Sequence, residues 1–168
     1  MTAYRITEAD GTDPDTAYLL RHFNALEPSW PILEPSHMHR GYWWLIYADS
    51  SRAGCGCTSM DRSHCREQDC DFAHPKRVGF CGMVPMTPFE SVGFMKRCWV
   101  APEHRGNNLQ LRCLAIREQK AKRLGWRQVV SETTSVQSAG NFIKAGYVPI
   151  LPEQPWGPEG SMYFQKAL

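Results

Sequence analysis

Apolar residues recur with helical spacing in three segments of the chain, each bounded by residues that favour a helix start or stop. The first segment has Pro14 in its first turn, and the second and third are followed by Gly125 and Gly146. The predicted helices are Pro14 to Leu26, Asn107 to Leu124 and Ser135 to Ala145. The apolar positions of the second helix are Leu111, Leu114, Ala121 and Leu124.

Short aromatic and β-branched runs between these helices predict strands. The strongest run is YWWLIYA at Tyr42 to Ala48. A turn at residues 49–51 connects it to a predicted hairpin partner at residues 52–58, which two glycines weaken as a strand. The predicted strands are Tyr4 to Thr7, Tyr42 to Ala48, Arg52 to Thr58, Val78 to Val84, Val92 to Val100, Gln128 to Thr134, Tyr147 to Leu151 and Ser161 to Lys166.

The order of these elements indicates an α/β fold. Strands joined through a helix tend to be parallel, and strands joined by a tight turn are antiparallel. We therefore predict a mixed, mostly antiparallel sheet of six to seven strands with flanking helices. The 168 residues, 42% of them hydrophobic, fit one domain spanning residues 1–168 with a Cys- and His-rich insertion at about 59–78.

The charges nearly balance, with 19 lysines and arginines against 17 acidic residues and a formal net charge of +2. A field of that size does not argue for a nucleic-acid or membrane partner. No apolar run reaches the roughly 18 to 20 residues of a membrane span, and residues 1–15 lack the pattern of a signal peptide. We expect a cytoplasmic protein, without a membrane partner, that meets charged ligands at a local site.

Seven cysteines are many for this length, but an odd number argues against a disulfide framework. The insertion and the strand before it contain possible zinc ligands: Cys55, Cys57, His64, Cys65, Cys70 and His74. Their spacing matches no strong zinc signature, and two cysteines on one strand face are also typical of core packing. We assign no metal and interpret the cysteines as reduced core and loop residues, with zinc as the alternative.

The segment from Val100 to Leu114, VAPEHRGNNLQLRCL, predicts an anion-binding site. A strand ends at proline, a polar loop follows, and an amphipathic helix begins at once. The N–H groups of a helix's first turn have no partner within the helix, and the helix dipole adds partial positive charge. Gly106 allows close backbone approach and Arg105 can add charge. Turn chemistry without a ligand is the alternative.

VAPEHRGNNLQ resembles the acyl-CoA loop of the GNAT acetyltransferases, in which Arg or Gln is followed by two residues, Gly, one residue, and Gly or Ala. Arg105 fits the first position, and Gly106 is common beside it. Asn108 and Gln110 replace the two small residues. Asparagine tolerates left-handed backbone angles better than other non-glycine residues, so Asn108 can stand for the first glycine.

A second segment, SVQSAGNFIKAGY at residues 135–147, resembles the later GNAT motif, in which Asn-x-x-Ser opens a helix that ends in Gly-Phe or Gly-Tyr. Ser138 and the Gly-Tyr end match this motif. Ser135 stands in place of the asparagine, and Phe142 stands where many members have a tyrosine proposed to protonate the departing thiolate.

The resemblance implies an N-acetyltransferase with acetyl-CoA as cosubstrate, whose strand backbone at residues 98–100 contacts the acyl and pantetheine groups. The cofactor-binding residues that it implies are Cys98, Trp99, Val100, Arg105, Gly106, Asn107, Asn108, Leu109, Gln110, Ser138 and Asn141. The acceptor is an amine of a protein, a small molecule or a modified nucleobase, selected by the loops at 27–41, 59–76 and 151–160. A GNAT-shaped protein that binds CoA or inhibits without turnover is the alternative.

An amine with a pKa near ~10 must lose a proton before it attacks a thioester. Glu132 and Glu90 are the candidate bases, and a solvated surface carboxylate is the alternative for each. Tyr147, Tyr163 or water can protonate the leaving thiolate, whose pKa is only about 8.5. Cys98 invites a covalent intermediate, but a strand cysteine without a paired histidine is usually a small buried apolar residue.

The second helix carries five basic residues that we interpret as a solvated face whose late positive charge suits the helix dipole. They are Arg112, Arg117, Lys120, Lys122 and Arg123. Contact with the 3′-phosphate of the cofactor or with a nucleic-acid acceptor is the alternative.

Overall fold

The computed structural model describes residues 2–49, 76–89 and 91–168. The strands are β1 (Ala3–Ala9), β2 (Tyr42–Asp49), β3 (Lys76–Pro85), β4 (Val92–Phe94), β5 (Cys98–Val100), β6 (Gln128–Thr133), β7 (Val148–Ile150) and β8 (Met162–Ala167). The helices are α1 (Pro14–Ala25), α2 (Pro35–Arg40), α3 (Leu109–Arg123) and α4 (Val136–Lys144), with a 3-10 turn at Pro102–His104.

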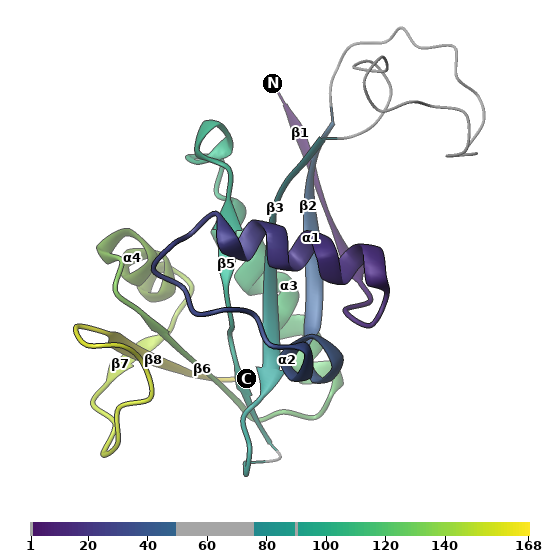
Figure 1. The fold of residues 1–168 in the computed structure, drawn as a ribbon. Helices are drawn as coiled ribbons and strands as arrows, with labels where there is room; N and C mark the ends of the chain where they lie inside the picture. The colour runs from purple at the N-terminus through teal and green to yellow at the C-terminus, as the bar shows by residue number, and fades with distance from the viewer. Residues whose placement is uncertain (1, 50–75, 90) are drawn as a thin grey trace, which may run out of the picture.

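One sheet, in the order β1-β2-β3-β4-β6-β8-β7, joins these strands, and β5 pairs with β3 off this path (Figure 1). Among the described strands only β4 and β6 pair in parallel, so the predicted mixed and mostly antiparallel α/β fold is confirmed. The sheet has eight strands rather than six to seven, because the predicted strand Val92 to Val100 is divided into β4 and β5.

Three further features of the structure differ from what the sequence predicted. Both edges of β2 are occupied, by β1 and β3, in place of the predicted hairpin with residues 52–58, which lie outside the described residues. The short helix α2 was not predicted, because residues 35–40 have too few apolar positions to show a helical period. β3 begins at Lys76, two residues before the predicted strand.

The predicted helix start at Pro14 and the predicted stops at Gly125 and Gly146 are confirmed, and Asp13 is a cap that the sequence analysis did not identify. Asp13 caps α1 by accepting a hydrogen bond from the N–H of Thr16. Helices α3 and α4 end two residues before Gly125 and Gly146, which have φ values of 77° and 83°. After each glycine, an N–H group returns to the last turn of the helix, as in Trp126 N–H to Ala121 O at 3.0 Å.

Helices cover both faces of the sheet, with α1 and α2 on one face and α3 on the other (Figure 1). On the first face, Phe23 of α1 packs against Phe80 and Trp99 at centroid distances of 6.0 and 5.3 Å. On the second face, α3 buries an apolar stripe against β3 and β5, and α4 packs beside α3. None of the helices in the described ranges is both long enough and apolar enough to cross a membrane.

Candidate active site

The sheet divides where β4 gives way to β5. Up to Met95 the chain follows β6, and the Met95 N–H donates to Val130 O at 2.8 Å. Arg97 then takes a left-handed φ of 57°, and the following residues pair with β3 alone. The strand therefore separates from β6 after Met95, and β5 has one edge without a paired strand among the described residues.

Contacts from distant parts of the chain hold Arg97 in this conformation. Its Nε donates to Asn24 Oδ1 at 2.9 Å and one of its Nη atoms donates to Pro31 O at 3.1 Å. The guanidinium also lies over the Trp30 ring, 4.9 Å from its centroid. A left-handed angle costs a non-glycine residue about 1–2 kcal/mol, which these contacts offset.

The edge of β5 that has no paired strand among the described residues carries backbone N–H groups that point away from β3. Ala101 N–H donates to Val78 O at 2.8 Å, so Trp99, two residues earlier in the antiparallel ladder, also directs its N–H and C=O at β3. The N–H groups of Cys98 and Val100 therefore point away from β3. Cys98 and Val100 are two of the three strand residues predicted to bind the cofactor. The backbone of the third, Trp99, is hydrogen-bonded to β3 instead.

The predicted anion loop follows β5 and leads into α3. Gly106 and Asn108 have φ values of 81° and 55°, so the left-handed angle expected of Asn108 is confirmed. Within the described part of the chain, the N–H groups from Gly106 to Leu111 donate no hydrogen bond. Such a run of free N–H groups at a helix start is a ready anion site.

Side chains of the loop hydrogen-bond to backbone carbonyls and to Tyr4, and so they stabilise its conformation. Arg105 Nε donates to Val100 O at 2.9 Å, and Asn107 Nδ2 donates to His104 O at 3.0 Å. His104 Nδ1 lies 3.1 Å from the Tyr4 hydroxyl. The loop is therefore tied to β5 and β1, and its own N–H groups are left for a ligand.

The predicted residues of α4 lie across from this loop. Asn141 Nδ2 donates to Gln110 Oε1 at 2.8 Å, so the two side chains link α3 to α4. Ser135 caps α4 by accepting from the Ser138 N–H at 3.3 Å. The structure thus brings Gln110 and Asn141 together beside the loop, whereas Leu109 turns its side chain into the core.

The candidate base Glu132 lies at the end of β6. Its carboxylate accepts a hydrogen bond from the Ser161 hydroxyl at 3.1 Å and is partly exposed. Burial lowers the pKa values of Lys96 and Arg97, and the Glu132 carboxylate partly offsets this effect. Glu132 therefore lies within electrostatic reach of the point where the sheet divides. The other candidate base, Glu90, lies outside the described residues.

Tyr147 and Tyr163 occupy different surroundings. Tyr147 is 2% exposed, and burial together with the neighbouring Glu118 raises the pKa of its hydroxyl well above the usual 10. Tyr163 stands opposite Glu132 on β8, and its hydroxyl accepts the Gly157 N–H at 3.1 Å. The placement of Tyr147 in the core lends no support to a catalytic role.

Three cysteines gather beneath β5, and all of those in the described part of the chain are free thiols. Cys81 and Cys98 face each other across β3 and β5, and Cys113 approaches from α3. Hydrogen bonding from Cys113 and the charge of Arg117 outweigh burial and lower the pKa of Cys98 to about 7. No His, Cys, Asp and Glu side chains at residues 2–49, 76–89 and 91–168 form a group that could hold a metal, and the zinc candidates at 55–74 lie outside those ranges.

The fold matches solved structures more clearly than the sequence matches known families. No family model matches the sequence, and no curated protein does. A GNAT family acetyltransferase from Elizabethkingia anophelis with acetyl-CoA bound has a TM-score of 0.64 at 14% identity, covering 98% of both chains. A Bacillus subtilis acetyltransferase in complex with CoA has a TM-score of 0.63 at 14% identity, covering 99% of both. A GNAT family acetyltransferase from Staphylococcus aureus MU50 has a TM-score of 0.65 at 13% identity, covering 98% of this chain and 99% of that one.

This chain has the GNAT fold. The predicted resemblance to the GNAT superfamily is thereby confirmed at the level of the fold. At the two positions where the GNAT loop has small residues, Asn108 takes a left-handed angle and Gln110 turns towards α4. Phe142, which replaces the tyrosine of many GNAT members, is buried against Tyr147 and Phe164 at centroid distances of 5.2 and 5.3 Å.

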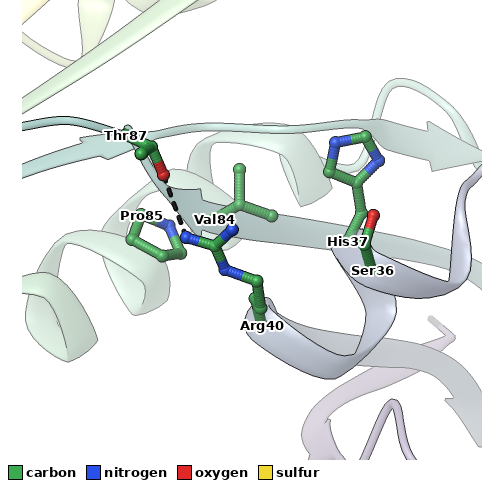
Figure 2. A pocket seen from close by; sticks show the side chains of 6 residues that line it. All are labelled: Ser36, His37, Arg40, Val84, Pro85 and Thr87. Atoms are coloured by element: carbon green, nitrogen blue, oxygen red, sulfur yellow. Dashed lines mark hydrogen bonds between the residues drawn. The ribbon is translucent and has the colours of Figure 1, made fainter.

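The sequence did not indicate a hollow that lies near the point where the sheet of this GNAT fold divides. It lies between α2 and the end of β3 and has a volume of about 230 Å³ (Figure 2). Ser36, His37, Arg40, Val84, Pro85 and Thr87 line it. The cluster of histidine and arginine in PSHMHR, within the loop expected to select the acceptor, was the available signal.

The thiol of Cys98 gives a chemical probe of the site. Iodoacetamide is expected to modify Cys98 well before the fully buried Cys81 and Cys113, at a rate that rises through pH 7, because the thiolate is the reactive form. Acetyl-CoA at ten times its Kd should slow the modification about tenfold. Peptide mass mapping separates Cys98 from the cysteines at 55–70, and equal rates with and without acetyl-CoA would exclude a ligand along β5.

Proposed function

We propose that this protein is an acetyl-CoA-dependent N-acetyltransferase that acts as a single domain and acetylates an amine by direct attack. The observation that carries the proposal is the run of free N–H groups from Gly106 to Leu111, next to the open edge of β5. The named structures with CoA and acetyl-CoA bound, which share the fold, support the same cosubstrate.

The chain offers a fitting group for each part of acetyl-CoA. The N–H groups at the start of α3 would hold the pyrophosphate, and the α3 dipole favours its negative charge. A Cβ added at Gly106 would meet nothing within 4 Å, so the backbone is open to a ligand there. The N–H groups of Cys98 and Val100 would pair with the pantetheine arm and donate to the carbonyl that becomes an oxyanion.

The remaining step is proton transfer. Acetyl-CoA supplies an acyl thioester, and Glu132 would accept a proton from the ammonium group of the acceptor, directly or through one water. The departing thiolate has a pKa of only about 8.5, so it needs little help near neutral pH. Tyr163 or water would supply that proton, because Phe142 has no hydroxyl and Tyr147 is buried.

The test is turnover. Release of free thiol from acetyl-CoA, with acetylated product identified by mass spectrometry, should depend on an amine drawn from a panel of small amines, peptides and nucleosides. Tight binding of acetyl-CoA without transfer to any amine would instead support a GNAT-shaped binding or inhibitory protein.

Substitution of the loop glycine tests the cosubstrate site. Gly106→Ala is expected to weaken acetyl-CoA binding about tenfold, because a methyl group would stand where the backbone meets the phosphate. The measurement is the acetyl-CoA-dependent rise in melting temperature, titrated to give a Kd.

Gly125→Ala is the matched control. Gly125 has nearly the same left-handed φ, 77° against 81°, and an added Cβ there also meets nothing within 4 Å. Both substitutions should therefore cost about 1–2 kcal/mol of stability, but only Gly106→Ala should change the Kd. An equal Kd for the two variants would contradict the assignment of the loop.

A further inference from the structure

The hollow beside α2 is shaped by one helix and the end of one strand. Figure 2 shows the His37 ring on one side and the Arg40 guanidinium on the other, with Val84 between them. Arg40 is held in place by a hydrogen bond from its Nη2 to the Thr87 hydroxyl at 2.9 Å. A volume of about 230 Å³ suits a small molecule rather than a long peptide.

Positive charge gathers around this hollow. Arg40 lines it, and Lys96 and Arg97 lie within electrostatic reach of His37. None of these three cations forms an ion pair with a carboxylate in the described ranges of the chain. Unpaired guanidinium and ammonium groups beside a concave surface attract an oxyanion.

The pKa of His37 responds to the same positive charges. Its pKa is lowered, first by burial and then by Lys96, Arg97 and Arg40, while Glu34 opposes the shift. The ring is therefore neutral near neutral pH and adds no positive charge of its own. Its Nδ1 is buried and has no hydrogen-bond partner among the described residues.

Negative charge lies on the other side of the dividing point. The Glu132 carboxylate acts on Lys96 and Arg97 from β6, whereas His37 and Arg40 approach from α2. Positive charge thus lies at the hollow, and a negatively charged carboxylate lies at the end of β6. This arrangement complements a molecule with an anionic group at one end and an amine at the other.

We infer that the hollow binds the oxyanion of a small acceptor amine, so that the acceptor class is amines carrying a carboxylate or a phosphate. The inference rests on the proposed acetyltransferase function and specifies its substrate. Arg40 would contact the oxyanion, and Lys96 and Arg97 would add long-range attraction. The amine would then be held towards Glu132, which accepts its proton.

The test compares amines that differ only in the anionic group. The panel pairs L-amino acids with their carboxamides, and O-phosphoethanolamine with ethanolamine, which distinguishes carboxylate from phosphate. Within the better pair, the anionic amine should have a kcat/KM about tenfold higher or more, mainly through KM. Arg40→Gln should remove most of this preference, and Arg123→Gln, at the exposed end of α3, should leave it unchanged.

The outcomes separate this inference from the proposed function. Transfer to amines with no preference for the anionic member, or a preference that survives Arg40→Gln, would overturn the inference and leave the acetyltransferase function standing. If no amine is acetylated, calorimetry with the same pairs still decides: Arg40-dependent binding of the anionic member supports the site without turnover. Equal or absent binding of both members overturns it.

Discussion

Glu132→Gln is expected to lower the kcat for acetyl transfer about a hundredfold, near the lower end of the range for loss of a general base. The substitution keeps the size of the side chain and a hydrogen-bond partner for Ser161, but an amide cannot accept the ammonium proton. Because the change is local, the melting temperature and its rise with acetyl-CoA should stay close to those of the wild type. Initial rates at saturating acetyl-CoA and acceptor measure the effect.

Three variants sharpen this result. Asp15→Asn, in the exposed first turn of α1, makes the same change from acid to amide away from the site and should keep full activity. Tyr163→Phe and Tyr147→Phe should each cost less than about tenfold, because the thiolate leaves readily without an acid. A tyrosine effect as large as the glutamate effect would contradict this account of the leaving group.

Glu90→Gln decides between the two predicted bases. If Glu132→Gln keeps its activity and Glu90→Gln loses it, the base lies on the approach to β4 instead. If neither substitution matters, water or the acceptor itself handles the proton, and neither glutamate is catalytic.

The geometry of the loop at residues 105–110 could be predicted from the sequence because it is local. A strand end, a glycine, an asparagine and an amphipathic helix follow one another within residues 100–114, and each has its own backbone preference. The left-handed angle of Asn108 is one such preference, and the structure bears it out. The same holds for the helix stops at Gly125 and Gly146, because glycine readily adopts the left-handed angle that follows a helix end.

The division of the sheet could not be predicted, because its cause is not local. The left-handed angle of Arg97 depends on Asn24 and Pro31, which are 73 and 66 residues away along the chain. Within residues 92–100 the sequence reads as one uninterrupted strand. The charged hollow was missed for the same reason, since Arg40 meets Val84 and Thr87 only when α2 packs beside β3.

Helix α3 shows a different kind of error. The five basic residues were interpreted as one solvated face, but Arg117 is 1% exposed, Arg112 donates to Tyr4 O and Lys120 pairs with Glu8 of β1. Only the last two, Lys122 and Arg123, are exposed without such contacts in the described structure. The spacing contained the signal, because the buried residues Leu109, Cys113, Arg117 and Ala121 follow one another at intervals of four.

The buried Arg117 acts on the backbone that divides the sheet. Its Nε donates to Cys113 O at 3.0 Å, and its Nη1 donates to Gly82 O at 2.9 Å and Arg97 O at 3.2 Å. The Gly82 carbonyl belongs to β3, and the Arg97 carbonyl lies at the point where the sheet divides. Arg117 therefore gives the Gly82 carbonyl a donor where β4 gives way to β5, and it adds a second donor to the Arg97 carbonyl, which also accepts the Gly82 N–H at 3.4 Å.

Arg117→Ala should consequently destabilise the protein by about 3–5 kcal/mol, the largest effect expected on stability. In the described structure, the substitution leaves the Gly82 carbonyl without a donor, at about 1–3 kcal/mol, removes one of the two donors of the Arg97 carbonyl, and opens a cavity. For a chain of this size, the melting temperature should fall by roughly 2–4 °C per kcal/mol. Arg123→Ala, on the exposed last turn of the same helix, should change stability by less than about 0.5 kcal/mol.

Arg117→Met separates the hydrogen bonds from the cavity. Methionine fills much of the space but donates nothing, so it should recover the cavity part of the loss but not the hydrogen bonds. Because these hydrogen bonds fix the backbone where β4 gives way to β5, next to the proposed acetyl-CoA site, Arg117→Met should also weaken acetyl-CoA binding. A change that only empties the core would leave the Kd of the folded protein intact. Wild-type stability in Arg117→Met would mean that relief from burying a charge outweighs the lost hydrogen bonds, and that the sheet divides without this arginine.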